Sequence, residues 1–338
     1  MFNVLPEKDV FPSFQWDSPM ATEPVPGALT TSTRRYGTAH FMSSDTSTKA
    51  SDFASDDWLL WNPGPPGATP PLVKHSMETL LRVIRTYPKM LAKGFQTPPI
   101  LHFTHTSPES ILWPMANCLS ISKMWADQSD GATDIIRRTI VQEMRSIFEQ
   151  YRSLDEKHLL AALQALTMYT VILMFPGRGQ LSVSLVDPAI FLCLQRVVNY
   201  VSKTGLLLTE ERDCKRPSWE SWIHVTAKRR AVFTLYLLHW SYSVYHGLQS
   251  FACSQLGFLP APAPKFLWQA ENKDKWEHLY YQWLVQWGEF PYMMHEFAAI
   301  LPGTALEPRT EKWLEDADEL GVLFFSIGTT VHPCVQWW

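Results

Sequence analysis

The sequence predicts an all-α protein: a multi-helix bundle or orthogonal helical domain over residues 72–338, preceded by a disordered arm over residues 1–71. From Leu72 onward, apolar residues recur three and four positions apart, as on one face of a helix, and alternating strand patterns are nearly absent. The chain has 338 residues, of which 46% are hydrophobic, so it can bury a sizeable core.

The arm is rich in Ser, Thr, Pro and Asp, and it ends in the helix-breaking run Asn62–Gly67. Within it, one patch mixes acidic and bulky apolar side chains: Asp56, Asp57, Trp58, Leu60 and Trp61. Such a patch is typical of an activation segment, whose aromatic side chains enter a groove on a partner protein. Docking of the same patch on the chain's own helical domain is the alternative, and the sequence leaves both open.

The first half of the helical pattern divides at proline, glycine and capping residues. We expect a first helix over Lys74–Leu91 that Pro88 ends or kinks. Three further helices are expected at Pro108–Trp125, from Asp130 or Thr133 to Arg152, and at Leu154–Phe175. Within the last of these, the apolar stretch Leu159–Phe175 has about the minimum length for a membrane span, but it contains Gln164 and Thr167, and we interpret it as part of a buried bundle helix.

In the second half, Asp187 followed by Pro188 predicts a helix start, with an end near Lys203 and Gly205 as its terminator. The longest helical pattern then runs from Ser218 to about Ser250. After three prolines between residues 260 and 264, we expect helices at Trp268–Trp287, Pro291–Leu301 and Thr310–Phe325.

Composition and motifs exclude several classes of function. The net charge of −4 provides no global attraction to polyphosphate, so direct nucleic-acid binding is not expected. The five cysteines lie far apart, which is typical of reduced thiols, and no pair has metal-ligand spacing. Motifs for nucleotide binding and serine hydrolases are absent, and His295-Glu296 lacks the second histidine of a metalloprotease because residue 299 is Ala. We therefore expect no cofactor and no metal, and an enzyme is the less favoured interpretation.

Two groups of histidines have spacings that raise the question of a metal. His102 and His105 could join Glu109 around zinc, but hydrogen bonds within a turn explain this common spacing equally well. His239, His246 and Cys253 follow one another at intervals of seven residues on the predicted long helix. Seven residues of helix correspond to roughly 10 Å, which is too far for a shared ion, so histidines satisfied within the core are favoured.

A series of short segments occurs in a defined order between about residues 75 and 290. They are Tyr87–Met90 with Pro98–His102, Pro114–Cys118 with Met124-Trp125, Leu160–Ala165, Trp219–Ile223 with Lys228-Arg229-Arg230, Tyr236–Leu238, and Leu259–Pro262 with Leu267-Trp268. Together they resemble the middle homology region of fungal zinc-cluster transcription factors, especially regulators found beside secondary-metabolite genes. The resemblance implies a nuclear regulator of a fungal biosynthetic gene cluster, with other transcription regulators or co-activators as partners and a homo- or heterodimer as its assembly.

Two departures from the family pattern change this expectation. The family usually has Glu shortly before the basic pair, where this chain has Thr226. The zinc cluster that reads DNA in the family needs six closely spaced cysteines, whereas the first 117 residues contain none. We therefore expect a regulator that acts through a partner protein or an effector, although an upstream exon that encodes the cluster stays open.

The candidate effector- or partner-binding residues are Trp219, Trp222, Arg229, Arg230, His239 and Trp283. The structural alternative packs both tryptophans in the bundle and bonds the arginines to carbonyls or to acids on another helix. The aromatic run from Trp268 to Tyr292, which includes Trp283, would line a cavity for a planar apolar effector or would fill the core. The alternative function is a cytoplasmic, motif-less enzyme or binding protein of secondary metabolism, such as a cyclase or pericyclase, with its cavity near Trp222, His239 or Trp283.

Overall fold

The structure, a computed structural model, describes residues 71–107, 109–128, 131–177, 182–248, 254–288, 290–300 and 303–331. These residues form twelve α-helices, four short 3₁₀ helices and one isolated β-bridge between Pro260 and Met293, with no strand among them. The predicted all-α class is therefore confirmed. The predicted arm, including the patch at Asp56–Trp61, lies outside the described residues apart from Pro71, where the first helix begins.

The centre of the helical domain consists of α5 (Glu156–Met174) and α8 (Trp219–His246), which pack against each other. Every residue of α5 from Leu159 onward is buried, as is every residue of α8 from Val225 to Val244. Polar side chains on such a helix need internal partners, and Thr167 accordingly donates its hydroxyl to the carbonyl of Leu163 at 2.8 Å. By length and composition α5 could cross a membrane, but 89% of its most apolar window is buried by other helices, as a core helix requires.

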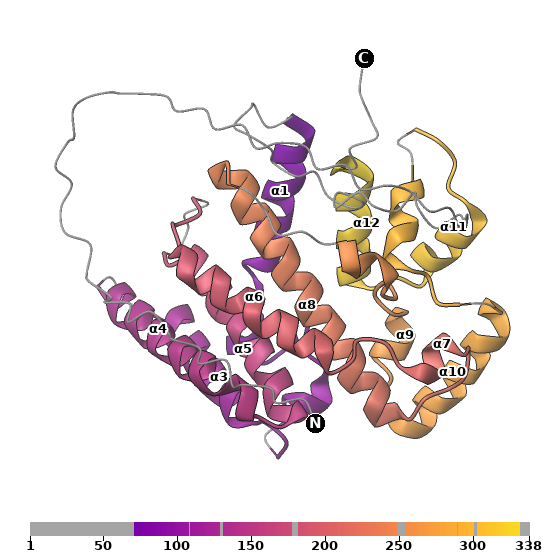
Figure 1. Cartoon of the computed structure of the whole chain (residues 1–338), viewed down its shortest axis with the longest axis horizontal. Coiled ribbons are helices and arrows are strands. Elements are labelled where there is room, and N and C mark those ends of the chain that lie inside the picture. The colour runs from indigo at the N-terminus through magenta and orange to yellow at the C-terminus, as the bar shows by residue number, and fades with distance from the viewer. Residues whose placement is uncertain are drawn as a thin grey trace, which may run out of the picture. The chain divides into compact units, whose positions relative to one another are not determined.

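The N-terminal helices pack around these two. Figure 1 shows α3 (Trp113–Ala126) and α4 (Thr133–Gln150) on one side of the domain. The helix α2 (Tyr87–Lys93) packs on α3 and α5, and α1 (Pro71–Ile84) packs on α8 and on the last helix, α12 (Glu319–Val331). The helix α6 (Pro188–Lys203) contacts both α5 and α8. It begins at Pro188 after the cap Asp187, and α8 begins after the cap Ser218, both as predicted.

The C-terminal helices lie on the other side in Figure 1. They are α9 (Lys265–Trp268), α10 (Lys273–Trp287) and α11 (Pro308–Glu315), and the short helix α7 (Thr209–Arg212), which precedes α8 in the chain, lies on the same side. The side chain of Asn272 caps α10 by accepting a hydrogen bond from the amide of Lys275 at 2.9 Å. Asp318 does the same at the start of α12, where its Oδ1 accepts from the amide of Gly321 at 2.9 Å.

Several predicted helix boundaries were wrong, each for a local reason. The single helix expected over Lys74–Leu91 is two, α1 and α2, because Pro88 lies in the first turn of a new helix and cannot continue the old one. The helix expected from Pro108 begins at Trp113, and the one expected to reach Ser250 ends at His246, where Gly247 adopts a φ of 65°. The caps Asn272 and Asp318 divide the last long segments. The described part of the helix expected at Pro291–Leu301 forms only the 3₁₀ helix η4 (Met294–Ala299).

Candidate ligand-binding site

The predicted site residue Arg229 is held in a buried ion pair. Its Nη1 and Nη2 donate to Glu211 Oε2 at 2.7 Å and Oε1 at 2.8 Å, and the two side chains are only 3% and 5% exposed. Nη2 also donates to the hydroxyl of Thr226 at 3.0 Å. The acid that pairs with Arg229 thus comes from another helix, α7 (Thr209–Arg212).

The neighbouring basic residues are equally engaged. Arg230 donates to Asp318 Oδ2 at 2.6 Å and to the carbonyl of Pro99 at 3.0 Å, and its guanidinium lies 4.2 Å from the centre of the Trp268 ring. Lys228 donates to the hydroxyl of Thr204 at 2.9 Å. The structural interpretation of the basic segment is therefore confirmed: its charges join α8 to α7, α6 and the start of α12 and are not presented to a ligand.

Trp222 and Trp283 belong to an aromatic cluster, which consists of Trp222, Trp268, Trp276, Tyr280, Trp283 and Trp287. The ring centre of Trp222 lies 5.4 Å from that of Trp276, and the centre of Tyr280 lies 5.3 Å from that of Trp283. The cavity beside Trp222 and Trp283 has a volume of only about 30 Å³, which is enough for about one water molecule. Of the two interpretations, a cavity for a planar molecule and a filled core, the packing supports the filled core, because the aromatic side chains occupy the space themselves.

His239 is also a core residue. It is 7% exposed, its ring centre lies 5.0 Å from that of Phe191, and burial lowers its pKa to about 4. It does not line the small cavity beside Trp222 and Trp283. Among the described residues, no group of three or more His, Cys, Asp or Glu side chains could hold a metal ion, and Cys253 lies outside them.

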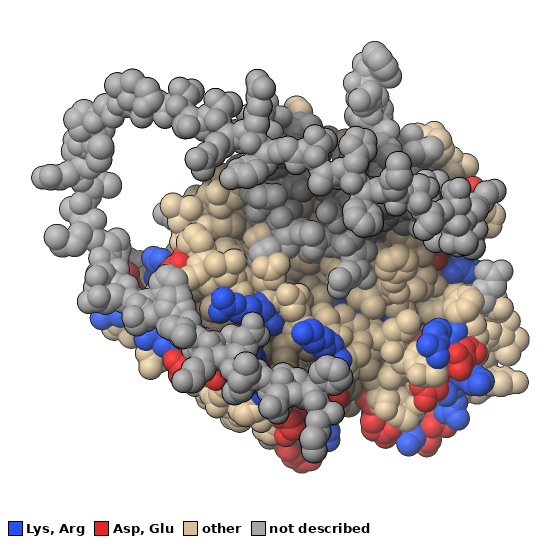
Figure 2. All heavy atoms as spheres, viewed as in Figure 1, with Lys and Arg blue, Asp and Glu red and all other residues tan. Residues whose placement is uncertain are grey.

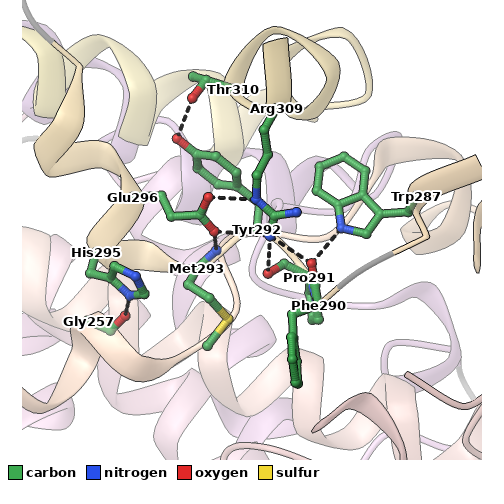
Figure 3. A network of polar contacts seen from close by, with 10 residues as sticks. All are labelled: Gly257, Trp287, Phe290, Pro291, Tyr292, Met293, His295, Glu296, Arg309 and Thr310. Carbon is green, nitrogen blue, oxygen red and sulfur yellow. Dashed lines mark hydrogen bonds and ion pairs between the residues drawn. The ribbon is translucent and has the colours of Figure 1, made fainter. Parts of the chain in front are cut away.

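A polar network holds the segment that follows the aromatic cluster (Figure 3). Arg309 donates to Glu296 Oε2 at 2.7 Å and to the carbonyl of Phe290 at 2.7 Å, and Trp287 Nε1 donates to the same carbonyl at 2.6 Å. The second oxygen of Glu296 accepts from the amide of Met293 at 2.7 Å. Because these groups satisfy one another, we interpret the network as a structural clasp between α10 and α11.

An open pocket of about 680 Å³ lies on the other side of the start of α8. The first turns of α5 and α8, the start of α3 and the loop that contains the 3₁₀ helix η1 (Phe103–His105) surround it. We call it the His105–His224 pocket. The residues that line it are Thr104, His105, Glu109, Ser110, Leu112, Met115, Glu156, Lys157, Leu160, Ala161, Gln164, Trp219, Glu220, Ser221, Ile223 and His224.

Local hydrogen bonds fix the walls of this pocket. Asp155 Oδ1 caps α5 by accepting from the amide of His158 at 2.9 Å, and Ser218 Oγ caps α8 by accepting from the amide of Ser221 at 3.1 Å. The loop is tied to α5 by Gln164, which is 1% exposed and donates its Nε2 to the carbonyl of Ile100 at 3.1 Å. A pocket whose walls are held in this way is largely pre-formed.

The two imidazoles of the pocket are uncharged at neutral pH. Burial, helped by the nearby Lys157, lowers the pKa of His105 to about 4. Burial and then Lys228 lower the pKa of His224 to about 4, although Glu156, whose Oε2 lies 3.4 Å from His224 Nε2, acts in the opposite direction. Each imidazole therefore offers one donor and one acceptor nitrogen. No hydrogen bond reaches three buried nitrogens of the lining residues: His105 Nδ1, Trp219 Nε1 and His224 Nε2.

Sequence reasoning found part of this site. Of the predicted binding residues, only Trp219 lines the pocket, together with His105 and Glu109, whose spacing raised the question of zinc. His224 and Gln164 were missed. Gln164 could have been found from the sequence, because a glutamine within an apolar helix needs a hydrogen-bond partner. His224 directly follows the Trp219–Ile223 motif, but nothing in its spacing relates it to His105.

Comparison of the chain with protein-family models, with curated proteins and with solved structures finds no match.

Proposed function

We propose that the helical domain binds an apolar small molecule in the His105–His224 pocket and serves as the effector-sensing part of a transcription-regulator-like protein. The observation that supports this is the pocket itself, whose volume of about 680 Å³ lies in the range of roughly 300–1,000 Å³ that small-molecule sites occupy. Its lining combines apolar side chains with a few fixed polar groups, which is the usual composition of such sites.

The regulatory half of the proposal rests on the resemblance to the middle region of fungal zinc-cluster factors. In this proposal the protein acts in the nucleus through other transcription regulators or co-activators, without touching DNA itself. The distribution of charge supports the absence of direct DNA contact. Figure 2 shows acidic and basic side chains side by side around α7 and α10. There Arg216 pairs with Glu277 at 2.7 Å, and Lys273 pairs with Glu220 at 3.5 Å. Such mixing leaves no basic patch there for phosphates.

The binding half can be tested with N-phenyl-1-naphthylamine, a neutral dye that fluoresces in apolar sites. We expect saturable binding of one dye per chain, which Ser221→Trp abolishes because the new indole fills the mouth of the pocket. Ser221 is exposed, so the substitution leaves the core intact. Ser120→Trp is the matched control, since Ser120 is an exposed helical serine that does not line the pocket. Equal binding by both variants would place the dye elsewhere and contradict the proposal.

The regulatory half can be tested by electrophoretic mobility shift with promoter DNA at physiological salt. We expect the purified protein to cause no sequence-specific shift, because its charge is −4 and only a partner would supply the DNA contact. A sharp shift that specific competitor DNA removes would contradict this version of the function.

An enzyme of secondary metabolism is the second candidate, and one observation favours it. His224 lies beside Glu156 in the pocket, and a carboxylate next to an imidazole can orient that imidazole for proton transfer. An enzyme would change the chemical identity of its ligand, whereas a sensor returns the ligand unaltered. Incubation with a lipophilic cell extract, followed by chromatography and mass spectrometry, separates the two, with heat-denatured protein as the control.

A further inference from the structure

The charged side chains around the His105–His224 pocket nearly balance. Three glutamates and one lysine line it, and all four are exposed. Glu220 lies 3.5 Å from Lys273, and Glu156 lies 3.8 Å from Lys228. This leaves Glu109 and Lys157, which have opposite charges, so the mouth offers neither a cation nor an anion a strong electrostatic advantage.

The charged side chain that reaches the polar lining is Glu156, and its Oε2 is already shared by His224 Nε2 at 3.4 Å and Lys228 Nζ at 3.8 Å. The polar lining consists of two neutral imidazoles, the Gln164 amide and the hydroxyls of Thr104, Ser110 and Ser221. A carboxylate or an ammonium group would lose hydration on entering and would find no unshared opposite charge among these groups in return. The lining therefore selects against ions of either sign.

One lining residue, Trp219, has a hydrogen-bond donor without an acceptor. An indole N–H can only donate, and Trp219 Nε1 has no hydrogen-bond partner. Trp276 and Trp283 share this property, but they are packed in the aromatic cluster beside a cavity of at most about 30 Å³, whereas Trp219 borders about 680 Å³. Nε1 of Trp219 is itself covered and the ring is half-buried, so presenting this N–H to a ligand requires a small rotation of the indole.

We infer that the pocket takes an uncharged molecule with an aromatic or otherwise apolar body and an oxygen acceptor, such as a ketone carbonyl, that receives the Trp219 N–H. This inference rests on the proposed function and names its ligand class. Neither the absence of charge nor the acceptor for Trp219 follows from the volume of the pocket alone.

Four naphthalenes of nearly equal shape test the rule by displacing N-phenyl-1-naphthylamine from the full chain. They are 2-acetylnaphthalene, which is neutral with an acceptor; 2-isopropylnaphthalene, which is neutral without one; the anion 2-naphthoate; and the cation 2-naphthamidinium. We expect the ketone to compete best, the hydrocarbon about fivefold more weakly because it lacks the hydrogen bond, and both ions at least about tenfold more weakly. Competition by either ion as strong as that of the ketone would overturn the inference while leaving the proposed function intact.

Trp219→Phe tests the acceptor separately. The phenyl ring retains the aromatic wall but has no N–H, so the ketone should lose about fivefold in affinity and become equal to the hydrocarbon, whose own affinity stays within about twofold. Unchanged preference for the ketone in this variant would overturn the role of Trp219. Failure of the dye itself to bind the unmodified chain would instead remove the proposed function, and this inference with it.

Discussion

Trp219 and Trp222 lie three residues apart at the start of α8, yet their surroundings differ completely. Trp222 is 2% exposed, and its ring centre lies within 6.4 Å of those of Trp268, Trp276 and Tyr280. Trp219 is half-buried and borders the open His105–His224 pocket. Two tryptophans of one motif thus have different roles. The side chains that other segments pack against each ring decide which role it has.

The two sides receive different side chains. The side of Trp222 faces α9 and α10, which supply large rings and leave about 30 Å³. The side of Trp219 faces the η1 loop and the first turns of α5, which supply small or polar side chains, such as Ala161 and Ser110, and leave about 680 Å³. Aromatic density therefore indicates a filled core, while small and polar residues around a single aromatic ring indicate a binding site.

The largest expected effect comes from removing the ring on the filled side. Trp222→Ala should lower the free energy of unfolding by about 4 kcal/mol, because the cavity cannot collapse among rings that already touch one another. Trp219→Ala should cost only about 1 kcal/mol, since that ring is half-buried beside open volume. Urea unfolding measures both. Equal costs for the two variants would erase the distinction between the two sides.

A second, somewhat smaller effect concerns the buried ion pair at the edge of the aromatic cluster. Glu211→Gln leaves Arg229, which is 3% exposed, without its counter-charge and should lower the free energy of unfolding by about 3 kcal/mol. The matched control is Asp213→Asn, since the carboxylate of Asp213 pairs with Arg212 at 40% exposure and should contribute less than about 0.5 kcal/mol. A small cost for Glu211→Gln would mean that water reaches this pair and that the filled side is less closed than its packing indicates.

Much of the fold could be read from the sequence because its signals are local. Asp187-Pro188 and Ser218 mark helix starts by capping chemistry alone, and the predominantly apolar stretch Leu159–Phe175 identifies a helix buried on all sides. The errors fell where two signals competed. Asn272 and Asp318 begin new helices within stretches whose apolar residues keep helical spacing on both sides. Because the spacing continues, it predicts one helix where the capping residue divides two.

The site was less predictable because it is assembled from distant segments. His105 and His224 are 119 positions apart by their residue numbers, and only the packing of α8 against α5 brings both to one pocket. The sequence identified Trp219 through its motif, but it assigned Trp222, His239 and Trp283 to binding although all three are packed in the core. Residue type shows what a side chain can do, and tertiary contacts decide whether space is left for it to do so.

The smallest expected effect concerns the pH dependence of the free energy of unfolding, to which His224 in the pocket contributes. His224 has a folded-state pKa of about 4, below the ordinary 6.5, so the unfolded chain binds a proton there before the folded chain does. Its contribution to stability is complete above pH 6.5 and is lost as the pH falls from 6.5 towards 4. His224→Gln removes the titrating group and should reduce the stability difference between pH 7 and pH 5 by about 1 kcal/mol in urea unfolding. His278→Gln on α10, where the histidine is exposed, is the matched control for the substitution. An unaltered pH dependence in the His224 variant would show that His224 takes up its proton equally in the folded and the unfolded chain, and burial would then not be what keeps this imidazole uncharged.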